Sequence, residues 1–201
     1  MDCEFPYFLD HLNKLAITPI INSRAERSLS GAYQSTISAG GYFSLDCELR
    51  RSSYDIAKRI AGFLMGLQGN TTTFKIELPE ILIKTSLYSG NILVKGASQT
   101  GRFVNVDGLP ISTNRILNTG DFIKFANSPK VYVLTRDLNS DGAGEGLLTL
   151  HTPLLGILPS DNENVVFKNV EWTVVLKEIV PFDINKYMRS DWSFSLEEVW
   201  G

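Results

Sequence analysis

Residues 137–142 (Asp-Leu-Asn-Ser-Asp-Gly) have types and spacing that could bind calcium. They begin like the ligand loop of an EF-hand, in which alternate side chains supply oxygen ligands. Counted from Asp137, the twelfth position is Leu148, where that loop needs a bidentate glutamate, and a strand pattern follows in place of a second helix. Asn, Asp and Gly in this arrangement also form ordinary hairpin turns. We therefore expect a turn; the alternative is a different calcium site that uses Asp137, Asn139, Asp141 and Glu145.

The other residues with ligand or catalytic chemistry lie in patterns that indicate structural roles. His11 and His151 belong to no metal-binding spacing. Residues 96–102 resemble a phosphate-binding loop, but a strand pattern follows them, so the helix N-terminus that would bind the anion is missing. Glu197 and Glu198 are adjacent, so a strand sends them to opposite sides, and we expect solvated carboxylates rather than a glycosidase pair. The sequence therefore predicts no enzyme, metal or cofactor.

The composition is that of a folded chain without general affinity for nucleic acid. Its 201 residues are 43% hydrophobic and 20% charged, which is enough for a packed core. The net charge of −3 argues against a phosphate-backbone binder, which needs clustered Lys and Arg. No apolar run approaches the roughly 20 residues of a membrane span, and the first eleven residues lack the basic region of a signal peptide. We expect synthesis in a reducing cytoplasm and no membrane partner.

The two cysteines, Cys3 and Cys47, are too few for a disulfide framework. We expect free, buried thiols, with a disulfide between them as the alternative.

Hydrophobic periodicity in the first half predicts a sheet and one helix. Residues 41–49 alternate as a half-buried strand, and a turn at 39–41 makes residues 32–38 its expected hairpin partner. Its inward residues are Phe43, Leu45, Cys47 and Leu49, and its outward residues are Ser44, Asp46 and Glu48. The helix spans about 53–68, with an apolar stripe of Ile56, Ile60, Phe63, Leu64 and Leu67. We attribute Gly62 and Gly66 to close packing of this helix on strands.

The second half has short strand patterns separated by turns. The expected strands are 73–78, 92–94, 103–106, 122–125, 131–134, 146–150, 165–168 and 171–180, with a core or interface strand within 192–200. This spacing indicates a small barrel or sandwich. We therefore predict a mainly β (α+β) fold in which residues 1–90 and 176–201 form one α+β layer and residues 91–175 form a small inserted β-barrel.

Several segments, taken in order, resemble tail-tip proteins of tailed bacteriophages. Residues 60–69 (Ile-Ala-Gly-Phe-Leu-Met-Gly-Leu-Gln-Gly) and 73–79 (Thr-Phe-Lys-Ile-Glu-Leu-Pro) match a helix-then-strand pattern of that group. Residues 94–101 (Val-Lys-Gly-Ala-Ser-Gln-Thr-Gly), 107–110 (Asp-Gly-Leu-Pro) and 117–123 (Leu-Asn-Thr-Gly-Asp-Phe-Ile) continue it, as do 132–135, 141–144 and 150–155. The resemblance covers about half of the chain and is to the distal tail protein (baseplate ring) family or a close paralogue.

This resemblance implies a tail-tube-like β-sandwich with one flanking helix and an appended barrel. It also implies a homohexameric ring in the virion that joins the tail tube protein to the baseplate hub proteins and leaves a channel for DNA. In such a ring, Asp46, Glu48 and Glu77 are candidate channel-facing carboxylates; ordinary solvated carboxylates are the alternative. A second possible function is a receptor- or carbohydrate-binding module of the virion, which would need exposed aromatic side chains among Phe103, Phe125 and Tyr132.

Overall fold

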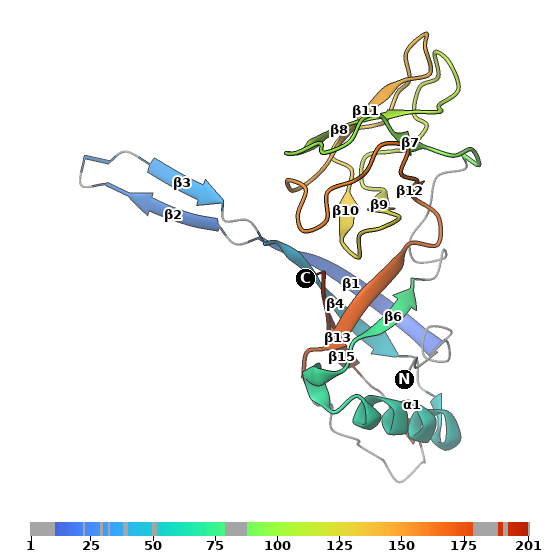
Figure 1. Ribbon diagram of the computed structural model, residues 1–201. Helices are drawn as coiled ribbons and strands as arrows, with labels where there is room; N and C mark the ends of the chain where they lie inside the picture. The colour runs from blue at the N-terminus through green and yellow to red at the C-terminus, as the bar shows by residue number, and fades with distance from the viewer. Residues whose placement is uncertain are drawn as a thin grey trace.

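The protein is mainly β, with antiparallel sheets and, among the described residues, one α-helix (Figure 1). The computed structural model describes residues 11–21, 23–28, 30–31, 33–37, 40–49, 52–78, 88–178, 189–190 and 193–200. Within these ranges, the helix is too short and too polar to cross a membrane.

A five-stranded antiparallel sheet forms the first layer. Its strands, in spatial order, are β1 (Leu12–Ile20), β4 (Tyr42–Leu49), β15 (Ser193–Glu198), β13 (Glu171–Leu176) and β6 (Phe74–Glu77). The predicted alternation of β4 is confirmed for Asp46 and Glu48, which are exposed, while Ser44 is buried against expectation. The expected core strand near the end of the sequence is also confirmed, because β15 lies in the middle of the sheet and buries Phe194 and Leu196.

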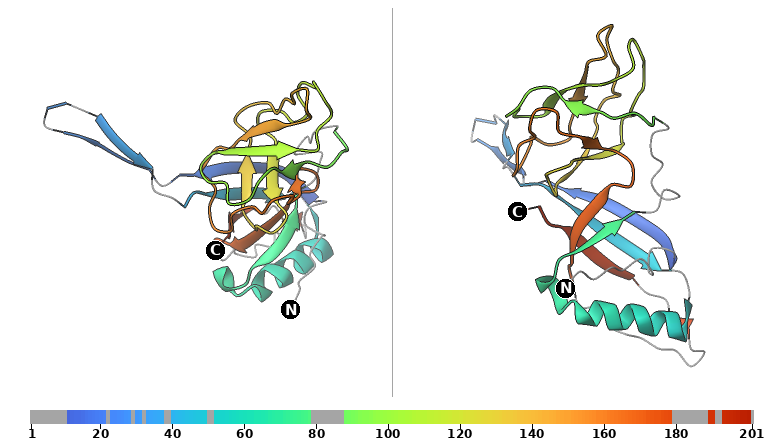
Figure 2. Two further views of the ribbon diagram at one scale, coloured as in Figure 1. Left: turned by 45° about the horizontal axis from the view of Figure 1, so that its top comes forward. Right: turned by 45° about the vertical axis from the view of Figure 1, so that its right-hand side comes forward.

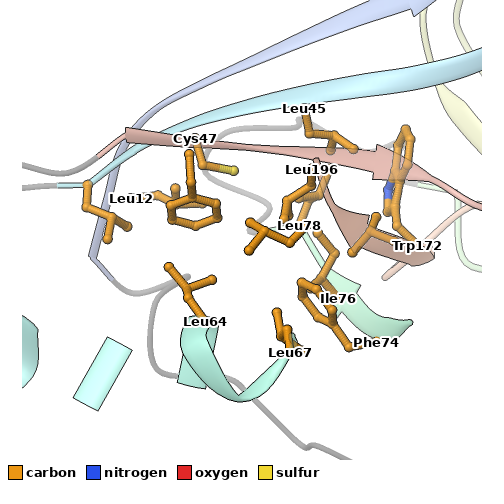
Figure 3. Close-up of a cluster of buried hydrophobic side chains, with 14 of the residues drawn as sticks. Leu12, Leu45, Cys47, Leu64, Leu67, Phe74, Ile76, Leu78, Trp172 and Leu196 are labelled. Carbon is orange, nitrogen blue, oxygen red and sulfur yellow. The ribbon is translucent and has the colours of Figure 1, made fainter. Parts of the chain in front are cut away.

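Helix α1 (Tyr54–Gly66) covers one end of the inner face of this sheet (Figures 1 and 2). The predicted stripe is confirmed, because Ile60, Leu64 and Leu67 are buried in one apolar cluster with residues of the sheet. Figure 3 shows Leu64 and Leu67 of this cluster beside Cys47, Phe74 and Ile76. A short 3-10 helix, η2 (Gly69–Thr71), follows, and β5 (Ser52–Ser53) pairs with β14 (Arg189–Ser190) beside α1.

The close packing expected at Gly62 and Gly66 is wrong. Both glycines are exposed, and a Cβ at either position would meet nothing within 4 Å. They therefore weaken the outer side of the helix without a packing role.

Residues 92–167 form a small closed barrel, as the strand spacing predicts. Its two three-stranded sheets are β11 (Gly146–Thr149), β8 (Phe103–Asp107) and β7 (Leu93–Val94), and β10 (Val131–Val133), β9 (Phe122–Phe125) and β12 (Val165–Val166). Two isolated bridges, Leu93–Asn164 and Leu134–Leu150, connect these sheets and close the barrel around its own apolar core. The predicted boundary at residue 176, where the chain was expected to leave the barrel and rejoin the first sheet, lies too far along the sequence. β13 already pairs in the five-stranded sheet from Glu171.

A two-stranded ribbon of β2 (Ser23–Arg27) and β3 (Tyr33–Ile37) projects away from both layers (Figures 1 and 2). The expected hairpin between residues 32–38 and 41–49 is therefore wrong, because β3 pairs with β2 and β4 pairs with β1 and β15. Alternation within a polar segment contains little information about which strand is the partner.

Candidate functional site

The outward face of the five-stranded sheet, which we call the open face, presents charged side chains from every strand. It comprises Lys14, Asp46, Glu48, Lys75, Glu77, Glu171 and Glu197, together with Lys177 just after β13. On β4, β15, β13 and β6 these residues alternate with buried apolar residues, so they lie on the face opposite α1. Glu171, at the start of β13, also lies 3.6 Å from Lys124 Nζ on β9 of the barrel.

Three contacts order part of the open face. Lys75 Nζ lies 3.0 Å from Glu171 Oε1, and Lys177 Nζ lies 3.2 Å from Glu197 Oε1. The Ser195 hydroxyl donates a hydrogen bond of 2.5 Å to Asp46 Oδ1 across the β4–β15 pair. All of these groups are partly exposed, so the contacts orient side chains more than they stabilise the fold.

The three sequence-predicted carboxylates are all exposed and lie on the open face. Asp46 and Glu48 are two residues apart on β4, but Glu77 lies on the far edge strand, with β15 and β13 between them. Among the described residues, none of the three forms an ion pair. The structure thus places them on one surface without gathering them into a cluster.

The inner face holds a charged pair that the sequence reasoning missed. Lys130 Nζ lies 2.5 Å from Glu198 Oε2, and both side chains are fully buried. Glu198 also accepts hydrogen bonds from the amides of Val131 (2.7 Å) and Phe43 (3.2 Å), so one carboxylate connects the barrel to β4. Burial raises the pKa of Glu198 and lowers the pKa of Lys130. Each partner opposes this shift through its charge.

The expectation that Glu197 and Glu198 are both solvated is therefore wrong for Glu198. The two residues do point to opposite sides, but the inward side is the core. Period-two spacing from Phe194 and Leu196 already places Glu198 on the apolar face of β15, and this was the available signal.

His151 completes the junction between barrel and sheet. Its Nδ1 accepts a hydrogen bond from the Val133 amide (3.1 Å), and its ring packs against Phe43 at a tilt of 35°, with centroids 5.0 Å apart. Burial, together with the nearby charges of Lys130 and Arg102, lowers the pKa of His151 to about 4. The neutral ring therefore packs as a structural element, as expected; His11 immediately precedes β1 and is half-buried.

Cys47 is buried on the inner face as expected, and burial raises the pKa of its thiol to about 12. It is a free thiol in the described part of the chain, and Cys3 lies outside the described residues. A thiol with this pKa is a packing group rather than a nucleophile at neutral pH.

The two loops with ligand-like sequences form turns. In residues 96–102, the Gln99 side chain donates to the carbonyls of Lys95, Gly96 and Asn105 before β8 begins. In residues 140–146, Asp141 Oδ1 accepts hydrogen bonds from the Ala143 and Glu145 amides, at 2.9 Å each.

The carboxylates of the alternative calcium site do not converge on one point, because each binds a different group of the protein. Asp137 accepts hydrogen bonds from the Thr119 amide and hydroxyl and lies 3.2 Å from Arg115 Nε, whereas Glu145 pairs with Lys95. The described residues contain no group of three His, Cys, Asp or Glu side chains placed to hold a metal ion.

The three aromatic candidates for carbohydrate recognition differ in solvent exposure. Phe125 and Tyr132 are fully buried in the barrel core, whereas Phe103 is 56% exposed on the barrel surface.

No protein-family model and no curated protein sequence matches this chain. The surfaces that offer a function are therefore the ribbon, the open face and the outer surface of the barrel.

Proposed function

We propose that this chain is a structural ring subunit of a bacteriophage tail tip, of the distal tail protein type, that joins the tail tube to the hub. In this proposal, the five-stranded sheet and α1 form the tail-tube-like unit, and six copies surround a channel for DNA. The projecting ribbon is the observation that carries it. The resemblance of the sequence to tail-tip proteins supports it independently.

The ribbon needs a partner on physical grounds. A two-stranded hairpin without further packing is marginally stable in water. Within the described residues, β2 and β3 pair only with each other, and Tyr33 is 65% exposed. A neighbouring subunit that covers the ribbon would bury this surface, and the same contact repeated around an axis closes a ring.

The edges of the five-stranded sheet support assembly as well. β1 and β6 are the edge strands, and each has a single strand partner among the described residues. Unpaired strand edges are sites at which another chain can add. Pairing of edges around a ring would produce a continuous β-wall, and the open face would then line its lumen.

The charge of the open face fits a DNA channel. Five carboxylates (Asp46, Glu48, Glu77, Glu171 and Glu197) stand against three lysines (Lys14, Lys75 and Lys177). A wall with excess negative charge repels the phosphate backbone, so DNA passes without binding.

The test is to replace residues 22–39 with an Asn-Gly turn, which joins the ends of β1 and β4 without the ribbon. Light scattering after size-exclusion chromatography measures assembly, alone and with the tail tube protein of the same virion. The wild type should form hexameric rings and the variant should not, while both unfold cooperatively at similar temperatures. Rings from the ribbonless variant, or a wild type that stays monomeric with the tube protein, would contradict the proposal.

A further inference from the structure

An amine and a carboxyl group meet at the junction of the barrel and the sheet, out of contact with solvent. Lys130 lies just before β10 of the barrel, and Glu198 is the last residue of β15 (Figure 1). Lys130 Nζ lies 2.5 Å from Glu198 Oε2, and both side chains are 0% exposed. These two groups are the reactants from which an amide bond forms.

Two aromatic rings enclose the lysine nitrogen beside the carboxylate. The ring centroid of Phe43 lies 5.1 Å from Lys130 Nζ, and that of Trp200 lies 5.8 Å from it. Two charges held in such a site lose their hydration, which a neutral amide does not need. Water is also the second product of amide formation, so a site that excludes water favours the bond and protects it from hydrolysis.

Burial favours the uncharged forms that react. It raises the pKa of Glu198 and lowers the pKa of Lys130, while the charge of each residue opposes the shift of the other. Transfer of one proton from Nζ to Oε2 across the 2.5 Å contact converts the ion pair into a free amine and a carboxylic acid. The free amine is the nucleophilic form of lysine, so the pair needs no external base.

Two backbone amides polarise the carboxyl group. The Val131 amide donates a hydrogen bond of 2.7 Å to Glu198 Oε1, and the Phe43 amide donates one of 3.2 Å to Oε2. Attack of the amine on the carboxyl carbon places negative charge on Oε1, where the Val131 amide already points. A donor fixed in this position stabilises the tetrahedral intermediate.

We propose that Lys130 and Glu198 become joined by an intramolecular isopeptide bond. A bond forms between Nζ and the carboxyl carbon of Glu198, and the bond from that carbon to Oε2 breaks. Nζ loses two protons to Oε2, which leaves as one water molecule. The reaction starts from the ion pair that the structure contains, and no oxidant, reductant or further reactant is needed.

The neighbouring titratable side chains at this junction already have other partners. His151 Nδ1 accepts the hydrogen bond of the Val133 amide, and the Tyr132 hydroxyl accepts that of the Leu155 amide at 3.0 Å. Neither therefore competes with Lys130 for the carboxyl group.

The open face provides a comparison within the same molecule. Lys177 Nζ lies 3.2 Å from Glu197 Oε1, one residue before Glu198, but both side chains are partly exposed. Water solvates both of these charges, so they remain an ion pair. Reaction at Lys130 without reaction at Lys177 therefore distinguishes the effect of burial from that of proximity.

The bond would attach the barrel to the sheet by a second covalent route. Residues 168–170 are the direct connection from β12 and its following residues to β13. A bond between residues 130 and 198 bypasses this connection, so the barrel stays attached even when residues 168–170 unfold. The inference does not rest on the ring proposal, because both reacting groups belong to one chain.

The test is intact-mass spectrometry of the purified full chain, kept folded at neutral pH for several days and then denatured. The wild type should be lighter than its sequence by one water molecule. Tryptic digestion should give the peptide 125–136, uncleaved after Lys130, joined to the peptide 190–201. Lys130→Arg keeps the positive charge, but its guanidinium stays protonated, so this variant should retain the full mass. Lys177→Arg is the matched control and should lose water as the wild type does.

A folded wild type that retains its full sequence mass would overturn the inference. Loss of water that persists in Lys130→Arg, or that maps to other residues in the digest, would overturn it as well. If Lys130→Arg fails to fold, the presence or absence of the joined peptide in the wild type decides the question alone. The mass of the chain does not depend on assembly, so this result and that of the ribbon experiment are independent.

Discussion

The two faces of the five-stranded sheet use the same residue types for different purposes. Glu197 and Glu198 are neighbours on β15. Glu197 meets Lys177 at 3.2 Å in solvent, whereas Glu198 meets Lys130 at 2.5 Å with both side chains fully buried. An ion pair on the open face contributes little to the free energy of unfolding, because water solvates either side chain when its partner is removed. On the inner face, the pair fixes the barrel to the sheet, because neither charge can remain there without the other.

The largest expected effect comes from a new charge placed on the inner face. Ile60→Asp puts a carboxylate where Ile60 is 1% exposed, which should lower the free energy of unfolding by more than about 4 kcal/mol. Chemical denaturation measures this loss, and Met65→Asp on the exposed side of α1 is the control. A soluble Ile60→Asp variant with the wild-type denaturation midpoint would show that the stripe is not buried.

The next largest effect should come from breaking the buried pair. Glu198→Ala leaves the Lys130 charge without a partner and should cost about 3–5 kcal/mol, while Glu197→Ala should leave the free energy of unfolding nearly unchanged. The double change Lys130→Met with Glu198→Gln removes both charges and keeps an acceptor for the Val131 and Phe43 amides, so it should recover much of the loss. Equal effects of the two single glutamate variants would remove the distinction between the faces.

A smaller effect should follow from acidification of the inner face. The pKa of His151 is lowered to about 4 in the folded chain from an ordinary value of 6.5, so between these values the unfolded chain binds the extra proton. This contribution to stability is complete above about pH 6.5 and declines as the pH falls towards 4. At about pH 5 it should amount to about 1–2 kcal/mol, allowing for the partly exposed ring. His151→Asn keeps an acceptor for the Val133 amide and should flatten the pH dependence of the denaturation midpoint; an unchanged slope would contradict this account.

The smallest effect on stability, and the largest on function, should come from the open face. Replacement of Asp46, Glu48 and Glu77 by Lys should leave unfolding nearly unchanged, because all three are exposed. If the open face lines the channel, assembled particles should adsorb normally but eject DNA slowly, and added salt should relieve the defect. Replacement by Asn, Gln and Gln is the control, with a weaker effect expected. Normal ejection of the Lys variant at low salt would contradict the channel position.

Elements with strong local periodicity could be predicted, and pairings over long sequence distances could not. The stripe of α1, the alternation of β4 and the strands of the barrel depend on apolar spacing within a few residues. The ribbon was assigned the wrong partner because the turn signal at 39–41 does not specify which strands pair. Local spacing places Glu198 on the apolar face of β15, but its pairing with Lys130 cannot be predicted, because Lys130 is 68 residues away and belongs to the barrel. The open face followed from alternation, but its charge pattern across strands required the sheet order.

The position of β15 also constrains the order in which the molecule can be made. The barrel uses only residues 92–167, so it can fold while later residues are still on the ribosome. The sheet cannot, because β15 inserts between β4 and β13, and until residues 193–198 emerge both neighbours present unpaired edges. Completion of the sheet therefore comes after folding of the barrel, and the same step delivers Glu198 to Lys130. The nascent chain is consequently most prone to misassociation just before this strand emerges.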